Sequence, residues 1–509
     1  MKKNKAKKII NILFLIFALL LTLLNVVIFF TMDYIKKNIG LVSIDEVIFH
    51  LKVPLQGTSR TMIRDIIFNY VIPAIAIFLI VLVPYLIRFK YKSEIEINIF
   101  QFKLVTNLKN ILIYIILFIN ILVLPLQLID IEKKFHVREY IKLQKQNSTF
   151  IEENYVDPRN VEITFPKQKR NLIYIYLESM EATYMDKEHG GNQDINLIPE
   201  LTELALENIN FSNSELLGGA SPINGTGWTT GGMVAQTAGI PLKIPFDVNS
   251  YVGYDSFLPG VYNLGDILYD NGYKNVLLIG SEAEFGGRDV YFGTHGHYEI
   301  KDYNDAIDEK IIKNNHYEFW GMEDSYLFKW AKKELKKLSK SNQPFNLTLL
   351  TVNTHFPDGY LEDDCEIVIE GNQYANVLAC SSKQVGEFIK WVQQQDFYEN
   401  TTIIINGDHL SMAGNSLYDG IDFYDRQIYN VIINSPITTS NNKNRKYTSM
   451  DLFPTTMAAL GASIDGDKLG LGINLFSDKK TIVEENDFSF VNIELTKKSD
   501  FYYNNLLYN

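Results

Sequence analysis

Carboxylate and imidazole side chains follow two apolar runs of the sequence. Glu178 comes directly after the run Leu172–Leu177, and Asp408 and His409 come shortly after the run Thr401–Ile405. Carboxylate oxygens and one imidazole nitrogen form a mixed ligand set that suits Mn²⁺, Mg²⁺ or Zn²⁺ and differs from a structural thiolate site. Taken alone, Glu178 could be a surface carboxylate, and the Asp-His pair could be a turn with a hydrogen-bonded histidine. Their joint position after apolar runs predicts that they hold one divalent metal ion, with Mn²⁺ as the first choice.

A hydroxyl group with the setting of a nucleophile lies in the glycine-rich segment Gly225–Gly232. Thr229 has glycines on both sides that let the backbone approach a phosphate, and Met233–Ala238 has the pattern of a helix start. A helix N-terminus stabilises an anion, and binding to a dication lowers the pKa of an alcohol. Thr229 is therefore predicted to be a fourth metal ligand and the nucleophile of a phosphoryl-type transfer. Taken alone, the segment is better explained as an ordinary glycine-rich turn with a capping threonine, and it is the joint pattern of the motifs that favours the catalytic role.

Two further side chains fit a phosphodiester site, although a structural role is the alternative for each. His355 is a candidate acid–base group or hydrogen-bond donor to phosphate, and Arg288 is a candidate clamp on a phosphate oxygen. His295 and His297 form a His-Gly-His pair, but no matching carboxylate is evident in the sequence. We therefore predict that this pair does not bind metal.

The elements that must position these groups are short apolar runs, which alternate with longer amphipathic segments from residue 171 onward. Continuous apolar strands separated by helices predict a largely parallel sheet covered on both faces, in an α/β domain of about 300 residues. Ligands of such sheets collect beyond the carboxyl ends of the strands, where Glu178, His355 and Asp408 all fall. The runs are Leu172–Leu177, Asn275–Gly280, Phe345–Val352, Thr401–Ile405 and Tyr429–Ile433.

Three charge-free apolar stretches precede this domain, at Ile9–Met32, Ile66–Ile87 and Asn110–Ile129. Each has about 20 residues or more, which is enough for a helix to cross a bilayer. A buried soluble helix is the alternative for any one of them, but three together favour a membrane anchor. The lysine-rich start Met1–Lys8 resembles that of a signal peptide, but the apolar run is too long and has no cleavage site. We expect an uncleaved anchor with this end in the cytoplasm, so that three crossings place the later residues outside it.

The predicted organisation has four parts: an anchor over residues 1–130, a juxtamembrane connector over 131–170, a catalytic domain over 171–480 and a tail over 481–509. The two cysteines, Cys365 and Cys380, both lie in the soluble part. Their even count and short spacing fit one disulfide in an oxidising compartment, and two separate thiols are the alternative. The formal net charge of −12 argues against a nucleic-acid partner.

Taken in order, these motifs resemble membrane phosphoglycerol transferases of the lipoteichoic acid synthase and sulfatase-like superfamily. The similarity covers roughly residues 170–476 together with the multi-span anchor. It is strongest to the phosphoglycerol transferase I branch, whose members decorate osmoregulated periplasmic glucans in Gram-negative bacteria. The matching segments are Tyr176–Ser179, Gly225–Thr229, Gly232–Ala235, Gly239–Pro241, Trp320–Asp324, Thr354–Gly359, Asn406–His409 and Ser449–Thr455.

The resemblance implies an alkaline-phosphatase- or sulfatase-like catalytic domain on the periplasmic side of the bacterial inner membrane, with a multi-pass anchor. It implies a ping-pong reaction in which Thr229 attacks the phosphorus of phosphatidylglycerol and diacylglycerol leaves. A sugar hydroxyl of a periplasmic glucan or surface polysaccharide then takes the glycerophosphoryl group. The implied metal ligands are Glu178, Thr229, Asp408 and His409, and the implied substrate contacts are Arg288, His355 and Trp228.

Several alternatives stay open at this point. A phosphoethanolamine transferase acting on lipid A or a surface glycan would use the same threonine chemistry, although such enzymes usually carry more cysteines. Water could replace the sugar in the second step. The region after the last matching segment is short, which leaves the identity of the acceptor open. A sulfatase would need a Cys- or Ser-x-Pro-x-Arg sequence, which the chain lacks. A non-catalytic membrane-anchored scaffold that binds glycan has no need for intact Glu178, Thr229, Asp408 and His409.

Overall fold

The computed structural model describes residues 2–40, 42–52, 56–87, 94–99, 102–244, 256–414 and 416–508. The chain divides into two compact units. One, called here the helical unit, comprises Met1–Ile39 and Arg60–Glu139. The other, called here the sheet unit, comprises Gly40–Ser59 and Tyr140–Asn509.

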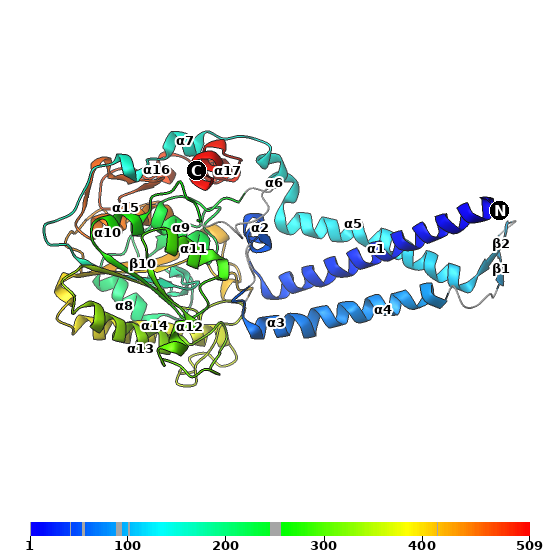
Figure 1. The fold of residues 1–509 in the computed structure, drawn as a ribbon, viewed down its shortest axis with the longest axis horizontal. Coiled ribbons are helices and arrows are strands. Elements are labelled where there is room, and N and C mark those ends of the chain that lie inside the picture. The colour runs from blue at the N-terminus through cyan, green and yellow to red at the C-terminus, as the bar shows by residue number, and fades with distance from the viewer. Residues whose placement is uncertain are drawn as a thin grey trace. The chain divides into compact units, whose positions relative to one another are not determined.

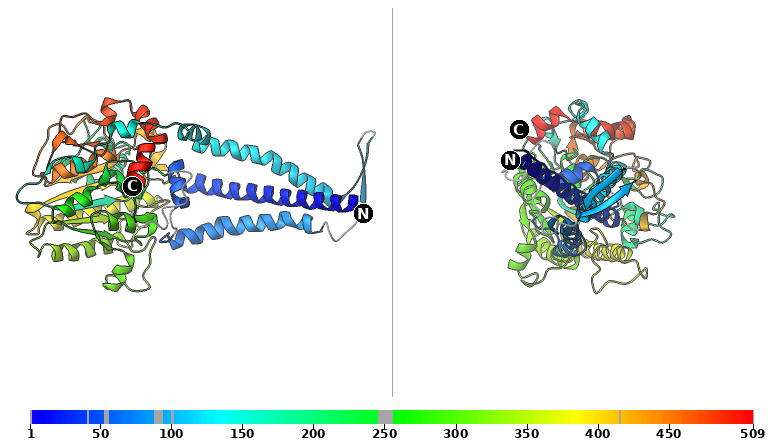
Figure 2. Two further views of the ribbon diagram at one scale, coloured as in Figure 1. Left: turned by 45° about the horizontal axis from the view of Figure 1, so that its top comes forward. Right: turned by 90° about the vertical axis from the view of Figure 1, so that its right-hand side faces the viewer.

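The helical unit contains three long apolar helices that run side by side (Figure 2). These are α1 (Lys2–Asn38), α4 (Ile72–Ile87), which continues α3 (Arg60–Ile66) through the π-helical turn η1 (Ile67–Val71), and α5 (Leu108–Phe135). By length and composition, Ile12–Asn38, Arg60–Val83 and Ile113–Phe135 could each cross a membrane. The three predicted apolar stretches thus form helices. A hairpin of β1 (Glu94–Ile99) and β2 (Phe102–Asn107) joins α4 to α5 in the sequence.

Polar side chains join α1 to α5 inside this apolar helical unit. The Asn25 side-chain amide donates to Asn120 Oδ1 at 2.8 Å, and the Asn120 amide donates to Thr22 Oγ1 at 3.2 Å. All three residues are buried. Because lipid provides no hydrogen-bonding partners, such interhelical bonds help fix which helix faces pair.

The sheet unit is built on a seven-stranded sheet in the order β5-β10-β9-β4-β8-β6-β7. Its five strands from β9 to β7 are parallel, and β10 runs antiparallel to both β9 and β5. Strands β8, β9 and β10 are buried along their whole length, as expected for apolar runs covered on both faces. The predicted α/β fold with a largely parallel sheet is confirmed. The strands are β4 (Asn171–Leu177), β5 (Gly219–Ala220), β6 (Lys274–Ile279), β7 (Glu299–Lys301), β8 (Phe345–Leu350), β9 (Thr401–Gly407) and β10 (Ile428–Ile433).

Helices cover both faces of this sheet (Figure 1). On one face, α8 (Pro199–Glu207) and α13 (Asp324–Leu338) pack against α14 (Gln373–Gln393). On the other, α9 lies among α10, α11 and α15, and it is the helix that reaches the candidate site. These helices are α9 (Thr229–Ala238), α10 (Leu264–Asp270), α11 (Arg288–Thr294) and α15 (Leu452–Ala459).

Two segments distant from the sheet in the sequence belong to the same unit. The first is α2 (Ile44–Lys52), which lies in the chain between α1 and α3. The second includes α17 (Phe488–Thr496) and the π-helical turn η10 (Tyr502–Leu507), in the region expected to be a tail. Buried side chains of both segments, such as Phe49 and Tyr502, join the main hydrophobic core. Smaller elements are α6 (Val137–Gln144), α7 (Phe150–Asn154), α12 (Tyr303–Asp308), α16 (Ile482–Glu485), β3 (Ile163–Thr164), β11 (Ser463–Ile464), β12 (Lys468–Leu469) and β13 (Gly472–Ile473).

Candidate metal centre and active site

The carboxyl ends of the neighbouring parallel strands β4 and β9 bring the predicted metal ligands together. Leu177 pairs in register with Gly407, so the residues that follow, Glu178 and Asp408, leave the sheet side by side. The backbone then ties the two ends to each other, because the Ser179 N–H donates to Asp408 Oδ1 at 2.8 Å. Sheet register therefore places both carboxylates at one edge, as predicted for a parallel sheet.

Helix α9 brings the predicted nucleophile to the same edge. Thr229 is its first residue, and a Cβ added at Gly232 would lie 2.1 Å from the backbone oxygen of Asp408. Only glycine allows this approach of helix to strand end, which the Gln236 side-chain amide reinforces by donating to Gly407 O at 2.9 Å. As a result, Thr229 Oγ1 lies 3.3 Å from Glu178 Oε2 and 3.5 Å from His409 Nε2.

The side chains of Glu178, Asp408 and His409 suit a divalent metal ion. One potential ligand atom from each lies within 4.8 Å of the others, and all three residues are buried. Asp408 Oδ1 accepts two backbone N–H groups, but its buried Oδ2 has no hydrogen-bond partner among the described residues. His409 Nδ1 donates to the Leu410 carbonyl at 2.7 Å. The other ring nitrogen, Nε2, faces both carboxylates and is the one that could bind a metal ion. An unpaired buried carboxylate oxygen beside an imidazole nitrogen that can lose its proton is a fitting donor set for such an ion.

The charged groups of this cluster strongly shift the pKa values of one another. Burial would raise the pKa of Glu178, but the imidazoles of His355 and His409 outweigh it and hold the value at about 2. Burial, together with the Glu178 charge, raises the pKa of Asp408 to about 8. Burial opposes charge on His409, yet the two carboxylates raise its pKa to about 10. In the absence of a metal, the site therefore retains protons that a bound dication would displace.

His355 lies on the loop that follows β8 and faces the same cluster. It is buried, and it is close enough to Glu178 for each to influence the pKa of the other. Its Nδ1 donates to the Phe356 carbonyl at 2.9 Å, so Nε2 is the nitrogen available to a substrate. Burial lowers the pKa of His355, which favours the neutral imidazole.

Arg288 and Trp228 are also buried next to this edge of the sheet. Arg288 begins α11, and its Nη2 donates to Ser281 Oγ and to the Glu282 carbonyl, at 3.2 and 2.8 Å. Its Nε has no partner among the described residues, and the same holds for Trp228 Nε1. Burial lowers the pKa of Arg288 to about 10, while Glu178 acts in the opposite direction. Both side chains thus retain a buried donor that a ligand could satisfy.

The neighbouring His-Gly-His pair has a structural setting. His295 Nδ1 lies 3.0 Å from Asp266 Oδ2, and its Nε2 lies 2.8 Å from the Phe257 carbonyl. The His297 ring packs on Tyr269, with 4.5 Å between centroids. With both ring nitrogens occupied, His295 has no lone pair to offer a metal in this arrangement.

The Sulfatase family profile matches residues 170–462, which is more than half of the chain. The chain belongs to the sulfatase family. The matched residues include Glu178, Thr229, Arg288, His355 and the Asp408–His409 pair. With its three long apolar helices, the protein is thus a membrane protein with a sulfatase domain.

A curated relative is phosphoglycerol transferase I from Escherichia coli (strain 55989 / EAEC). The two are 34% identical over 316 residues, which cover 61% of this chain and 39% of the relative. The chain therefore spans about two fifths of the length of the curated relatives that it matches.

Solved structures show the same fold. The lipoteichoic acid synthase LtaP from Listeria monocytogenes has a TM-score of 0.52 and 17% identity, with 72% of this chain and 100% of that chain covered. The integral membrane protein EptA, a lipooligosaccharide phosphoethanolamine transferase from Neisseria meningitidis, has a TM-score of 0.50 and 14% identity. It covers 87% of this chain and 84% of its own. These likenesses place the sulfatase domain in the alkaline-phosphatase-like fold.

Sequence reasoning missed the contribution of α2 to the sulfatase domain. Phe49 is fully buried, and its ring lies 5.4 Å from the ring of Trp228. His50 stacks on Phe285 at 5.9 Å, and burial, together with the charges of two site histidines, lowers its pKa to about 4. A nine-residue amphipathic segment between two apolar helices gives no sign of which domain it packs on. Trp320, whose ring lies 4.4 Å from that of His355, was detectable only through the family resemblance.

A buried ion pair joins the loops that carry the metal ligands. Arg426 Nε donates to Glu181 Oε2 at 3.0 Å, and Glu181 Oε1 accepts the Ser411 N–H at 2.8 Å. Glu181 lies three residues after Glu178, and Ser411 lies two residues after His409. The pair therefore holds the two ligand-bearing loops of the sulfatase domain to each other and to the start of β10.

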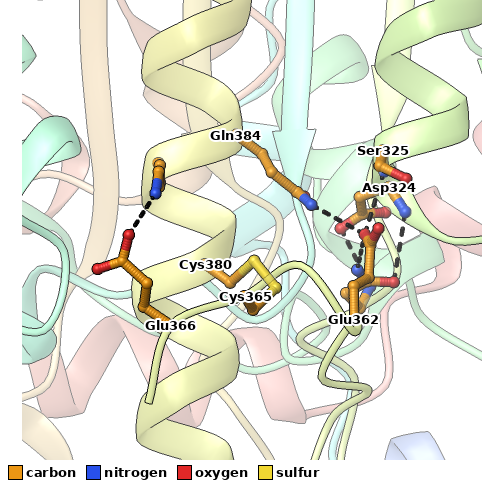
Figure 3. The surroundings of a disulfide bond; sticks show 9 residues. Asp324, Ser325, Glu362, Cys365, Glu366, Cys380 and Gln384 are labelled. Atoms are coloured by element: carbon orange, nitrogen blue, oxygen red, sulfur yellow. Dashed lines mark hydrogen bonds and ion pairs between the residues drawn. A yellow bond between two sulfur atoms is a disulfide. The ribbon is translucent and has the colours of Figure 1, made fainter. Parts of the chain in front are cut away.

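The two cysteines form a disulfide between the loop after His355 and helix α14 (Figure 3). Cys365 and Cys380 are 15 residues apart in the sequence. Beside the disulfide, the Glu362 carboxylate accepts from the amides of Asn353 and Gln384 at 2.7 and 2.9 Å. The loop that follows His355 is thus held to helix α14 by one covalent bond and by hydrogen bonds beside it.

Proposed function

We propose that this protein is a phosphotransferase that moves a glycerophosphoryl group from phosphatidylglycerol to a hydroxyl group of a periplasmic glucan or surface polysaccharide. The observation that carries the proposal is the position of Thr229. Its hydroxyl stands at the start of a ten-residue helix, 3.3 Å from Glu178 and 3.5 Å from His409 of the candidate metal set. The similarity to phosphoglycerol transferase I supports the choice of donor.

In the first half-reaction, Thr229 Oγ1 forms a bond to phosphorus while the bond from phosphorus to the diacylglycerol oxygen breaks. Glu178, Asp408 and His409 would hold a divalent metal ion, with Mn²⁺ expected first and Mg²⁺ or Zn²⁺ possible by ligand chemistry. When bound, the ion would supply positive charge that acidifies the threonine alcohol and offsets the charge of the phosphate. The N–H groups at the start of α9 and the Arg288 guanidinium stabilise the phosphate oxygens. We assign to His355 Nε2 the transfer of the Thr229 hydroxyl proton to the oxygen of the departing diacylglycerol.

In the second half-reaction, a sugar hydroxyl attacks the same phosphorus, and the bond from phosphorus to Thr229 Oγ1 breaks. The proton of the sugar hydroxyl returns to the threonine alkoxide through the neutral His355. The enzyme is then regenerated, and the net reaction exchanges one alcohol for another on a phosphodiester. No oxidant or additional cofactor enters the balance.

We place the sulfatase domain on the periplasmic side of the inner membrane, behind a multi-pass anchor. The three apolar helices support the anchor, and the Cys365–Cys380 disulfide supports an oxidising compartment. A site tethered to a membrane meets lipid headgroups at high effective concentration, which suits a lipid donor.

The test is the intact mass of the detergent-purified full chain after incubation with phosphatidylglycerol and Mn²⁺, without acceptor. We expect a gain of one glycerophosphoryl group in the wild type and in Thr229→Ser, and none in Thr229→Ala. An adduct only from phosphatidylethanolamine would reassign the enzyme to phosphoethanolamine transfer. No adduct from either lipid and no bound metal would favour a non-catalytic glycan-binding scaffold.

A further inference from the structure

A cavity of about 230 Å³ lies beside the candidate active site within the sheet unit. One wall is the start of α2 with the residues before it, and another is the loop Pro222–Gly227 that leads to the nucleophile. A third includes Leu410, which directly follows the candidate ligand His409. Two walls of this cavity therefore continue straight into the chain segments that build the metal centre.

Gly227 leaves space in this cavity without a local structural need for glycine. A Cβ added there would meet no described atom within 4 Å, and its φ lies outside the left-handed region. In contrast, Gly225, two residues earlier, has a φ of +84° and faces Pro241 at 2.7 Å. A larger side chain at Gly227, which lines the cavity, would therefore begin in open space and would not strain the backbone.

Glu46, on α2, is the only ionisable side chain among the described residues that line the cavity. It is 4% exposed, and burial raises the pKa of its carboxyl to about 8, with His409 close enough to act in the opposite direction. Its N–H donates to Ser43 Oγ at 3.1 Å, which gives the helix start a serine cap. A capping role for the Glu46 side chain is the structural alternative, and glutamine fills that role as well as glutamate.

The lining of the cavity defines the chemistry of a ligand. A single buried carboxyl disfavours an anion, so the phosphate belongs at Thr229 and not in the cavity. A neutral group with several hydroxyls can pack its C–H faces on apolar walls and donate hydroxyl hydrogens to the carboxyl group. The apolar walls are Val42, Ile223, Leu410, Met412, Phe423 and Ile428.

We propose that this cavity is a polyol subsite in which Glu46 accepts hydrogen bonds from the hydroxyl groups of a substrate. The inference rests on the proposed function, which offers two sources of such a group. One is the sugar ring of the acceptor, and the other is the glycerol of the donor headgroup. The segment between the first two apolar helices would then take part in substrate binding, and Glu46 is a specificity-determining residue.

The test measures the two half-reactions separately on the full chain in detergent. Intact mass follows adduct formation from phosphatidylglycerol with Mn²⁺, and then the loss of the preformed adduct on addition of a soluble glucose oligosaccharide. The variants are Glu46→Gln, which keeps the cap, and Gly227→Val, which fills the cavity. Glu485→Gln, which removes an exposed carboxylate at a different cavity, is the matched control.

We expect Gly227→Val to slow one half-reaction by at least about tenfold, because the new side chain fills space that the hydroxyl groups would occupy. Glu46→Gln should slow the same half-reaction by a smaller factor, because glutamine keeps one of the two oxygens that can accept a hydrogen bond. Slower transfer to the oligosaccharide assigns the subsite to the acceptor sugar, and slower adduct formation from phosphatidylglycerol assigns it to the donor glycerol. If both half-reactions stay within about twofold of the wild type in both variants, with unchanged melting temperatures, the subsite is refuted. A wild type that forms no adduct at all overturns the proposed function first, and this inference with it.

Discussion

The contact between helix α9 and the end of β9 makes Gly232 a sensitive position. In Gly232→Ala, the new methyl group would lie 2.1 Å from the Asp408 carbonyl oxygen, whereas an ordinary contact is at least 3.4 Å. The neighbouring atom is backbone and cannot rotate away. Helix and strand end must therefore separate by more than about 1 Å, and overpacking of this kind costs about 1–3 kcal/mol of the free energy of unfolding.

The separation acts directly on the candidate site, because Thr229 begins the helix that moves and Asp408 belongs to the strand end that it leaves. A misplacement of about 1 Å of a reacting group can reduce the rate about 100-fold. We therefore expect Gly232→Ala to form the glycerophosphoryl adduct about two orders of magnitude more slowly, with a lower melting temperature. The assay is the time course of the intact mass with phosphatidylglycerol and Mn²⁺, with the melting temperature measured in the same detergent.

Gly293→Ala is the matched control, since its Cβ would meet only Ile300 Cδ1 at 4.0 Å in a helix. That variant should melt at or slightly above the wild-type temperature, because alanine favours a helix over glycine by about 1 kcal/mol. If Gly232→Ala forms the adduct at the wild-type rate, the close approach of α9 to the strand end does not fix the position of Thr229.

Three further predictions follow from contacts of the sulfatase domain. Cys365→Ser should lower the free energy of unfolding by about 3 kcal/mol, the loop-closure contribution of a disulfide of this span, and reductant should lower the wild-type melting temperature but not that of the variant. Arg426→Met leaves the buried Glu181 carboxylate unpaired and should lower the free energy of unfolding by about 3–5 kcal/mol. Adding Glu181→Gln should recover much of this loss in thermal unfolding, and equal melting temperatures of the single and double variants would contradict the prediction. Metal affinity should rise with pH, because an incoming dication displaces the proton of His409, whose pKa is raised to about 10. Calorimetry from pH 6 to 8 should show that the affinity increases about tenfold per pH unit for each proton released. An affinity that does not change with pH would contradict this prediction.

The sheet and the edge where the candidate residues meet were predictable from the sequence. Apolar runs such as Leu172–Leu177 and Thr401–Ile405 are long enough to be strands buried on both faces, and the structure has β4 and β9 there. Since parallel strands end at one edge, the position of Glu178 and Asp408 after their runs already indicated a shared site. Their roles as ligands remain predictions.

Other features depend on contacts that local patterns do not encode. The approach of Gly232 to Asp408 requires the packing of α9 on β9, and a glycine-rich turn has the same sequence signature with or without it. The segment Ile44–Lys52 is too short for its periodicity to show its partner. The polar and aromatic residues after 480 likewise gave no sign that Tyr502 enters the core, because burial of a tyrosine is decided by what surrounds it.

The assignment of α2 to the sheet unit has a consequence for shedding of the domain from the membrane. A single proteolytic cut in the connector near residues 145–149 would release a fragment without the residues that precede it. That fragment would lose Phe49 from its place against Trp228 and would leave part of its core open to water. A soluble form made by one cleavage would therefore be an incomplete fold. The α2 segment, which completes the core of the sheet unit, would remain connected to the apolar helices.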